Sequence, residues 1–198
     1  LLLWDDKAQR FSAYRHRQGD PLSLGADRVF EVMHDRSGTL WVGTWEGGAS
    51  RADLDIGGFE RYAHRPGDPR SLPDSPVGAQ AEEGDGTLWV GTLKGLHLFD
   101  PPSGNVLKSY RHDPGKADSL SDDRVFFLLP ESDGRLWIGT RAGLNLLDRK
   151  SGSLRRIPLK TGSSSENFTQ AARAPDGALW LGSFGGLTRY DPRDGSVR

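Results

Sequence analysis

The 198-residue sequence contains no cysteine, a single methionine and almost no excess of charge of either sign. Without cysteine it forms no disulfide and performs no thiol chemistry, and the composition fits an oxidising or a reducing compartment equally well. A formal net charge of −1 gives no general electrostatic attraction to nucleic acid or to an acidic membrane. We therefore expect no nucleic-acid partner.

Long apolar runs are also missing. No stretch is long enough to span a bilayer, and no basic segment followed by an apolar one has the form of a secretory signal, so we expect no direct membrane insertion by this segment. No stretch shows the 3.6-residue periodicity of a long helix. Because 35% of the residues are hydrophobic and 27% are charged, the chain can still bury a core. These features favour an all-β fold.

Nearly the same five residues occur four times, each time with tryptophan in second place. The pentapeptides are LWVGT at 40–44, LWVGT at 88–92, LWIGT at 136–140 and LWLGS at 179–183, and their tryptophans are spaced by 48, 48 and 43 residues. A period in this range indicates one supersecondary unit copied along the chain. Residues that the repeat imposes are therefore weak candidates for functional residues.

Glycine-containing turns divide each repeat into four short strands. A Ser-Gly or Asp-Gly pair precedes each pentapeptide, and such pairs indicate hairpins because glycine adopts the positive φ of a tight turn. We expect first strands at 29–34, 77–82, 125–129 and 168–173, third strands such as 95–100, and fourth strands at 11–17, 59–65 and 106–111. Four short antiparallel strands per period are typical of a β-propeller blade.

The chain is out of phase with its own repeat. It begins at a third strand, and after residue 191 it ends where a fourth strand would start. We therefore predict an incomplete arc of a larger propeller, with complete blades at 27–65, 75–112 and 123–160 and partial blades at 1–17 and 166–198. Closure into a four-bladed ring, with 11–17 completing the last blade, stays open as an alternative, although the surplus first strand argues against it.

The repeats resemble the two-component regulator propeller repeat over essentially the whole chain. The resemblance rests on DGRLWIGT followed by GLNLLD, on DGALWLGS followed by GLTRYD, and on the linkers at 70–77 and 118–125. The linker at 160–166 departs from the family pattern because it is shorter and lacks the Ser-Leu pair.

The resemblance implies a function as well as a fold. In this family such propellers form the periplasmic sensor part of membrane-bound signalling proteins, ahead of a histidine kinase or a diguanylate cyclase. It therefore implies a periplasmic, non-enzymatic sensor that binds a small molecule or an oligosaccharide such as a glycan fragment. Its further partners would be the remaining blades, a membrane-linked output domain and, in the full protein, a second copy in a dimer.

Two other classes of function remain open, a propeller enzyme and a protein-binding scaffold. Streptogramin lyases are propellers of related appearance, but here His97 is a lone candidate without an identifiable acid partner. A glycoside hydrolase needs two acids about 5 to 9.5 Å apart, which the sequence does not show. We identify no catalytic residue and no cofactor.

The residues that recur with the repeat are expected to be structural. The repeat tryptophans, at 41, 89, 137 and 180, should pack between blades, because each buries roughly 150 to 250 Å². His16, His64 and His112 recur at one position, which we place on the outermost strand. Successive blades are about 10 Å apart, which is too far for these histidines to share a metal, and we expect no metal site. The acids Glu82, Glu83 and Asp85 are expected to be solvated turn residues.

The positions that vary against the repeat are better candidates for binding. The turn between the second and third strands changes in every copy, and in a propeller these turns share a face with the linkers around the mouth of the central channel. Aromatic and charged side chains on loops held by a rigid frame are typical of binding sites. We predict ligand contacts from Trp45, Glu46, Lys94, Arg141 and Phe184.

Overall fold

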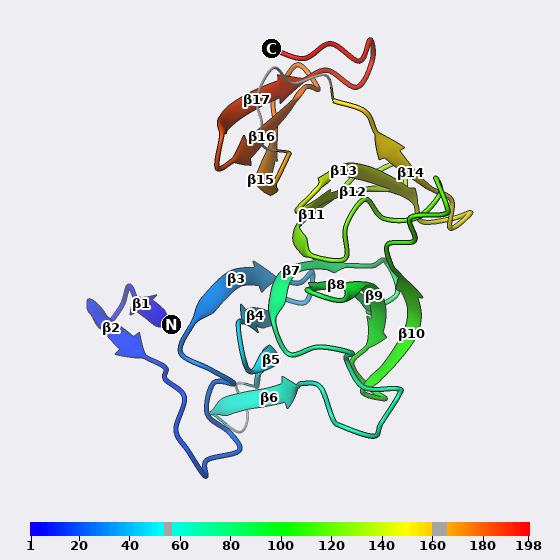
Figure 1. Ribbon diagram of the computed structural model, residues 1–198. Coiled ribbons are helices and arrows are strands. Elements are labelled where there is room, and N and C mark those ends of the chain that lie inside the picture. Colours follow the sequence, from blue (N-terminus) through cyan, green and yellow to red (C-terminus); the bar gives the residue numbers. More distant parts are fainter. Residues whose placement is uncertain (54–56, 160–165) are drawn as a thin grey trace.

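The structure is a computed structural model that describes residues 1–53, 57–159 and 166–198. Within these residues all regular elements are strands, seventeen in number, arranged in five antiparallel sheets (Figure 1). The first sheet contains β1 (Leu2–Asp5) and β2 (Arg10–Ala13). The first complete blade contains β3 (Val29–His34), β4 (Leu40–Thr44), β5 (Gly48–Asp53) and β6 (Gly58–Tyr62).

The remaining strands repeat this order. The second complete blade contains β7 (Val77–Glu82), β8 (Leu88–Thr92), β9 (Gly95–Asp100) and β10 (Asn105–Tyr110). The third contains β11 (Val125–Pro130), β12 (Arg135–Thr140), β13 (Gly143–Asp148) and β14 (Leu154–Ile157). The last sheet contains β15 (Phe168–Arg173), β16 (Leu179–Ser183) and β17 (Gly186–Tyr190).

The sheets follow one another as the blades of a propeller. Figure 1 shows the sheet β1–β2 near the N-terminus at one end of the arc, and β15–β17 near the C-terminus at the other. In the described residues β2 pairs with β1 and β17 pairs with β16, and no ladder joins the first sheet to the last. The prediction of an all-β propeller arc with complete and partial blades is confirmed, and the alternative of a ring closed by residues 11–17 is wrong.

The hairpin turns have the backbone that the sequence predicts. The glycine of each turn between first and second strands has a positive φ: 85° at Gly38, 89° at Gly86, 96° at Gly134 and 86° at Gly177. Because side chains other than glycine are strained in this region, these positions determine where each repeat reverses direction. The predicted end of the third blade at residue 160 and the short linker at 160–165 lie outside the described residues.

The core lies between the blades, where the repeat tryptophans contact the next sheet. Trp41 clusters with Val90, Trp89 with Ile138 and Trp137 with Leu181, and each of these indoles is at most 3% exposed. Trp180 is 39% exposed. The packing prediction is therefore confirmed for three tryptophans and wrong for Trp180, because no further sheet of the described residues packs against this face of β16.

A glycine two residues after the tryptophan allows the blades to approach. A Cβ atom placed on Gly91 would lie 2.5 Å from Cγ1 of Val125 in the third blade. At Gly43 it would lie 3.0 Å from the carbonyl oxygen of Val77 in the second blade. A side chain at either position would push the neighbouring blade away, which explains why the repeat keeps glycine there.

The fourth strands are shorter than predicted, and this changes the place of the recurring histidines. His16, His64 and His112 follow the ends of β2, β6 and β10 rather than lying on the outermost strands. Each ring Nδ1 is hydrogen-bonded to the backbone carbonyl of the leucine eight residues later, at 2.9, 2.9 and 2.6 Å respectively. These leucines are fully buried linker residues. These hydrogen bonds therefore hold each linker against the blade that precedes it.

Candidate functional site

The five predicted ligand-binding residues all lie in turns between second and third strands. Trp45 is half-buried, whereas Glu46, Lys94, Arg141 and Phe184 are exposed, Phe184 to 85%. The linkers approach the same turns, because the backbone N–H of Trp45 donates to Arg28 O at 3.0 Å, and Arg141 donates likewise to Arg124 O at 3.1 Å. We call this surface, made of turns and linkers, the turn face. The five residues come from four different sheets, and no hydrogen bond between two of them is present in the described ranges.

The first complete blade carries an aromatic platform on the turn face. The ring of Trp45 stacks on Phe30, with centroids 4.9 Å apart and an angle of 27° between the planes. The guanidinium carbon of Arg28 lies 5.3 Å from the centroid of the same indole. Phe30 is 46% exposed. Arg28, Phe30 and Trp45 thus form a stacked cationic and aromatic surface that is partly open to solvent.

A β-bulge directs the side chain of Phe30 toward Trp45. The pairing of β3 with β4 shifts register between Val29 and Glu31, which leaves Phe30 as the extra residue. Bulges bend a strand and redirect the side chain of the extra residue. Equivalent shifts occur in β7, β11 and β15, at residues 78, 126 and 169. The sequence pattern did not predict the bulges, and the only available signal was a break in strand alternation, as in the adjacent Phe126 and Phe127.

The turn face carries four exposed cations, Arg28, Lys94, Arg124 and Arg141. Arg124 pairs with Asp122 at 3.7 Å. Two linker acids are instead engaged by backbone groups, since Asp27 accepts from His16 N–H at 2.8 Å and Asp123 accepts from His112 N–H at 2.6 Å. The turn face can therefore offer stacking together with charged donors.

The opposite end of the blades contains a cleft of about 570 Å³ among the turns between first and second strands. We call this surface the hairpin face. The cleft is lined by residues of three blades: Met33, His34, Arg36, Gln80, Ala81, Glu82, Glu83, Gly84, Pro130, Glu131, Ser132 and Arg149. Its rim is held by ion pairs, with Arg36 and Glu82 at 3.3 Å and Arg149 and Glu83 at 2.8 Å.

Acids of the hairpin face are structural partners of three of the four repeat tryptophans. Each indole Nε1–H donates to the acid six residues earlier: Trp41 to Asp35 at 3.0 Å, Trp89 to Glu83 at 2.6 Å, and Trp137 to Glu131 at 2.7 Å. Glu131 also pairs with Arg173 of the last sheet. The expectation that Glu82 and Glu83 are simply solvated is wrong, because both bind arginines of neighbouring blades, whereas Asp85 is exposed as expected.

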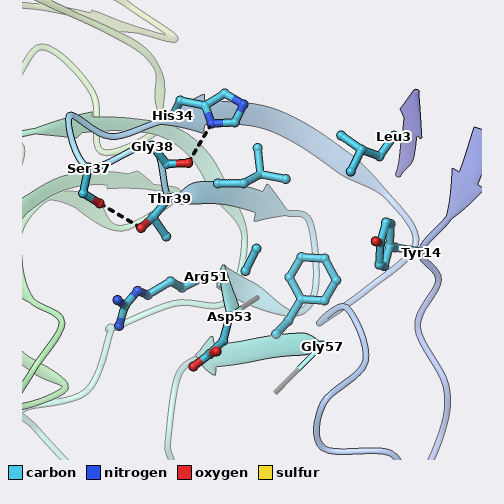
Figure 2. A pocket seen from close by; sticks show the side chains of 13 residues that line it. Leu3, Tyr14, His34, Ser37, Gly38, Thr39, Arg51, Asp53 and Gly57 are labelled. Atoms are coloured by element: carbon cyan, nitrogen blue, oxygen red, sulfur yellow. Dashed lines mark hydrogen bonds between the residues drawn. The ribbon is translucent and has the colours of Figure 1, made fainter. Parts of the chain in front are cut away.

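A second cavity, of about 450 Å³, lies between the first sheet and the first complete blade. Figure 2 shows Leu3 and Tyr14 on one side of it and the turn containing His34, Ser37 and Thr39 on the other. The ring Nδ1 of His34 is hydrogen-bonded to Gly38 O at 3.2 Å. The apolar walls of this cavity are the packing faces of two neighbouring sheets, so we do not place a ligand site there.

His97, the lone candidate for a lyase base, is a buried structural residue. Its side chain is fully buried, with Nδ1 2.9 Å from Ser109 Oγ and Nε2 3.3 Å from Thr92 Oγ1. Burial lowers the pKa of the imidazole to about 4, so the ring is neutral at neutral pH. Because both ring nitrogens have intramolecular partners, His97 does not reach a substrate.

In the described residues, no group of three or more His, Cys, Asp or Glu side chains is placed to hold a metal ion. In the same part of the chain, no helix has the length and apolar character needed to cross a membrane.

Comparison with known proteins supports the resemblance seen in the repeats. Residues 119–142, which include the end of the linker before the third blade and all of its first two strands, match the family model described as two component regulator propeller. No curated protein matches the sequence. The match confirms the family resemblance for this repeat.

Solved structures match the whole chain. Two are extracellular domains of proposed hybrid two-component systems from B. thetaiotaomicron, with TM-scores of 0.78 and 0.76 at 19% and 20% identity over 100% of this chain. A virginiamycin B lyase from Staphylococcus aureus matches with a TM-score of 0.68 at 18% identity, also over 100% of this chain. The chain spans 29% and 30% of the two B. thetaiotaomicron structures and 61% of the lyase. These similarities establish the propeller fold.

Proposed function

We propose that this chain is part of the extracellular sensor propeller of a bacterial membrane-bound signalling protein and acts by binding a ligand rather than by catalysis. The observation that carries the proposal is the stack of Arg28, Phe30 and Trp45 on the turn face. It lies on a rigid blade, is partly exposed and combines an aromatic surface with a cation. Such a platform suits a ligand with a flat face and polar edges, of which a sugar ring in a glycan fragment is one example.

The family match and the similar solved structures support this class of function over an enzyme. They link the repeat to two-component regulators and the fold to extracellular domains of such systems. In this proposal the blades at 1–17, 27–65, 75–112, 123–160 and 166–198 belong to a larger periplasmic propeller with a membrane-linked output domain. The lyase shares the fold, but the buried His97 gives no support to the same chemistry here.

The proposal is tested by calorimetry with a panel of oligosaccharide fragments on the wild-type chain and on Trp45→Ala and Arg141→Ala. We expect a fragment whose affinity falls at least about tenfold in Trp45→Ala, since that change removes the stacking surface. The matched control is Leu93→Ala, at the equivalent turn of the second blade, which should retain affinity. Equal affinity in the wild type, Trp45→Ala and Arg141→Ala would exclude the turn face.

The signalling role is tested by the full coding sequence. A membrane-spanning segment followed by a kinase or cyclase domain is expected. A secreted propeller without any output domain would contradict the sensor role and favour the enzyme.

A further inference from the structure

One edge of β1 is open, unlike the edges of the equivalent strands in the complete blades. β5 pairs with β4 on one side and with β6 on the other, and β9 pairs likewise with β8 and β10. Within the described residues, β1 pairs with β2 alone. An open edge presents backbone N–H and C=O groups to which a further strand can bind.

The pairing of β1 with the chain that follows it fixes the repeat position of each residue in β1. Leu1 and Tyr14 exchange backbone hydrogen bonds of 3.0 and 2.9 Å. In the second complete blade the same place is taken by the ladder partners Leu96 and Tyr110. Leu1 is therefore the counterpart of Leu96, and Tyr14 is the counterpart of Tyr110.

It follows that Leu3 has the position of Leu98, which lies opposite Trp89 in the ladder of β8 and β9. A second strand bound to the open edge of β1 would place its tryptophan opposite Leu3. Residues that lie opposite one another in a ladder project to the same face of the sheet. Leu3 lines the cavity of about 450 Å³ between the first sheet and the first complete blade (Figure 2), so the indole would enter this cavity.

The walls of the cavity correspond to the residues that surround the tryptophans of the complete blades. Tyr14 lines the cavity, and the ring of its counterpart Tyr110 has its centroid 6.0 Å from that of Trp89. On the side of the first complete blade, the walls include Leu40 and Ala52. Their counterparts cluster with the tryptophan of the preceding blade: Leu88 and Phe99 with Trp41, and Leu136 and Leu147 with Trp89.

The cavity is large enough for an indole, and its walls are less covered than their counterparts. Leu40 and Ala52 are half-buried, whereas their four counterparts are at most 1% exposed. An apolar cavity of about 150 Å³ already holds a benzene ring. A tryptophan side chain in this cavity would therefore fit and would bury both wall residues.

We propose that the open edge of β1 and this cavity form an acceptor site for a strand that carries the Leu-Trp-x-Gly-Thr pentapeptide of the repeat. The occupant is the second strand of the same blade, in the part of the longer protein that comes before residue 1. This inference rests on the proposed function only in that it takes the chain as part of a larger propeller. It does not depend on what the turn face binds.

The spacing within the repeat gives the place of the occupant in the longer protein. Trp89 precedes Leu96 by seven residues, and Trp41 precedes Ala49, which pairs with Tyr62 at the same position, by eight. The acceptor site therefore assigns a tryptophan to the position seven or eight residues before Leu1.

The test adds the missing strand to the full chain. Eleven residues with the sequence of residues 85–95, DGTLWVGTLKG, are placed directly before Leu1, so that they enter in the register of the second blade. The control extension has alanine in place of its tryptophan. We expect the tryptophan extension to melt at least about 5 °C above the alanine extension, because only the indole fills the cavity. Equal melting temperatures would overturn the proposal.

Two variants show whether the indole occupies this cavity. Leu3→Trp fills the cavity from β1 itself, whereas Leu2→Trp makes the same substitution at a 65% exposed residue on the opposite face of the strand. In Leu3→Trp the difference between the two extensions should fall to less than about 2 °C, and in Leu2→Trp it should persist. An undiminished difference in Leu3→Trp would place the indole elsewhere and refute the assignment.

The coding sequence tests the identity of the occupant. It should contain the pentapeptide with its tryptophan seven or eight residues before Leu1. Another residue at that position would leave the acceptor site to a second copy or to a different partner and would refute this occupant. Trp45→Ala tests the turn face separately, so a failed extension together with intact ligand binding would reject the acceptor site alone.

Discussion

The indole Nε1–H of Trp89 donates a 2.6 Å hydrogen bond to Oε2 of Glu83. The same carboxylate pairs through Oε1 with Arg149 of the third blade at 2.8 Å. One acid thus joins the core tryptophan of its own blade to a cation of the next. In the last repeat Ala174 replaces this acid, and Trp180 is more exposed than the other three repeat tryptophans. The same link recurs in the third blade, where Glu131 joins Trp137 to Arg173 of the last sheet.

Replacing Trp89 by alanine should lower the free energy of unfolding by about 3 to 5 kcal/mol, the usual cost of deleting a large buried aromatic side chain. The matched control is Trp180→Ala, which should cost clearly less because this indole is already partly exposed. Urea unfolding followed by circular dichroism measures both. Equal losses in the two variants would contradict the assignment of Trp89 to the inter-blade core.

Glu83→Ala should destabilise the chain by about 1 to 3 kcal/mol, because it removes the acceptor of Trp89 Nε1–H and of Arg149 Nη1. A double-mutant cycle with Arg149→Ala isolates the pair. We expect the double variant to lose less stability than the two single variants together. Strict additivity would mean that the ion pair does not couple the second and third blades.

The raised pKa of Glu31 predicts a stability that depends on pH. The folded-state pKa of about 8 exceeds the ordinary value of 4.5, so the folded chain holds a proton that the unfolded chain releases. The associated stabilisation is fully present below about pH 4.5 and is lost as the pH rises through 8. Glu31→Ala, which copies Ala79 of the second blade, should remove this slope.

The measurement is the difference in unfolding free energy between wild type and Glu31→Ala from pH 6.5 to pH 8.5. Taking the difference cancels His97, whose lowered pKa changes stability on the acid side of this window. Parallel curves for the two proteins would show that Glu31 titrates normally.

Residues 1–198 expressed alone should self-associate. The terminal sheets leave large apolar side chains exposed: Leu2, Trp4 and Phe11 in the first, and Trp180, Phe184 and Leu187 in the last. Apolar patches and unpaired strand edges favour association. Sedimentation velocity at several concentrations should show a rising average mass. A monomer at every concentration would mean that these faces are covered in solution.

Much of the fold could be predicted because its signals are local. The hairpin glycines, the tryptophan pentapeptides and the alternating strands each lie within a few residues, and their period reports a copied blade. The ends of the fourth strands were predicted less well. His16 and its equivalents bind linker carbonyls eight residues later, which ends the strand before the histidine is reached.

The sequence by itself determined the all-β propeller, the arc of partial and complete blades, and which turns vary against the repeat. Only the tertiary structure decided that a bulge turns Phe30 toward Trp45, that Glu83 meets Arg149, and that Glu31 and Gln80 share one seam. The physical reason is distance along the chain. A repeat pattern reports neighbours within one blade, whereas contacts such as that between Glu83 and Arg149, 66 residues apart, depend on strand register and on how closely two blades pack.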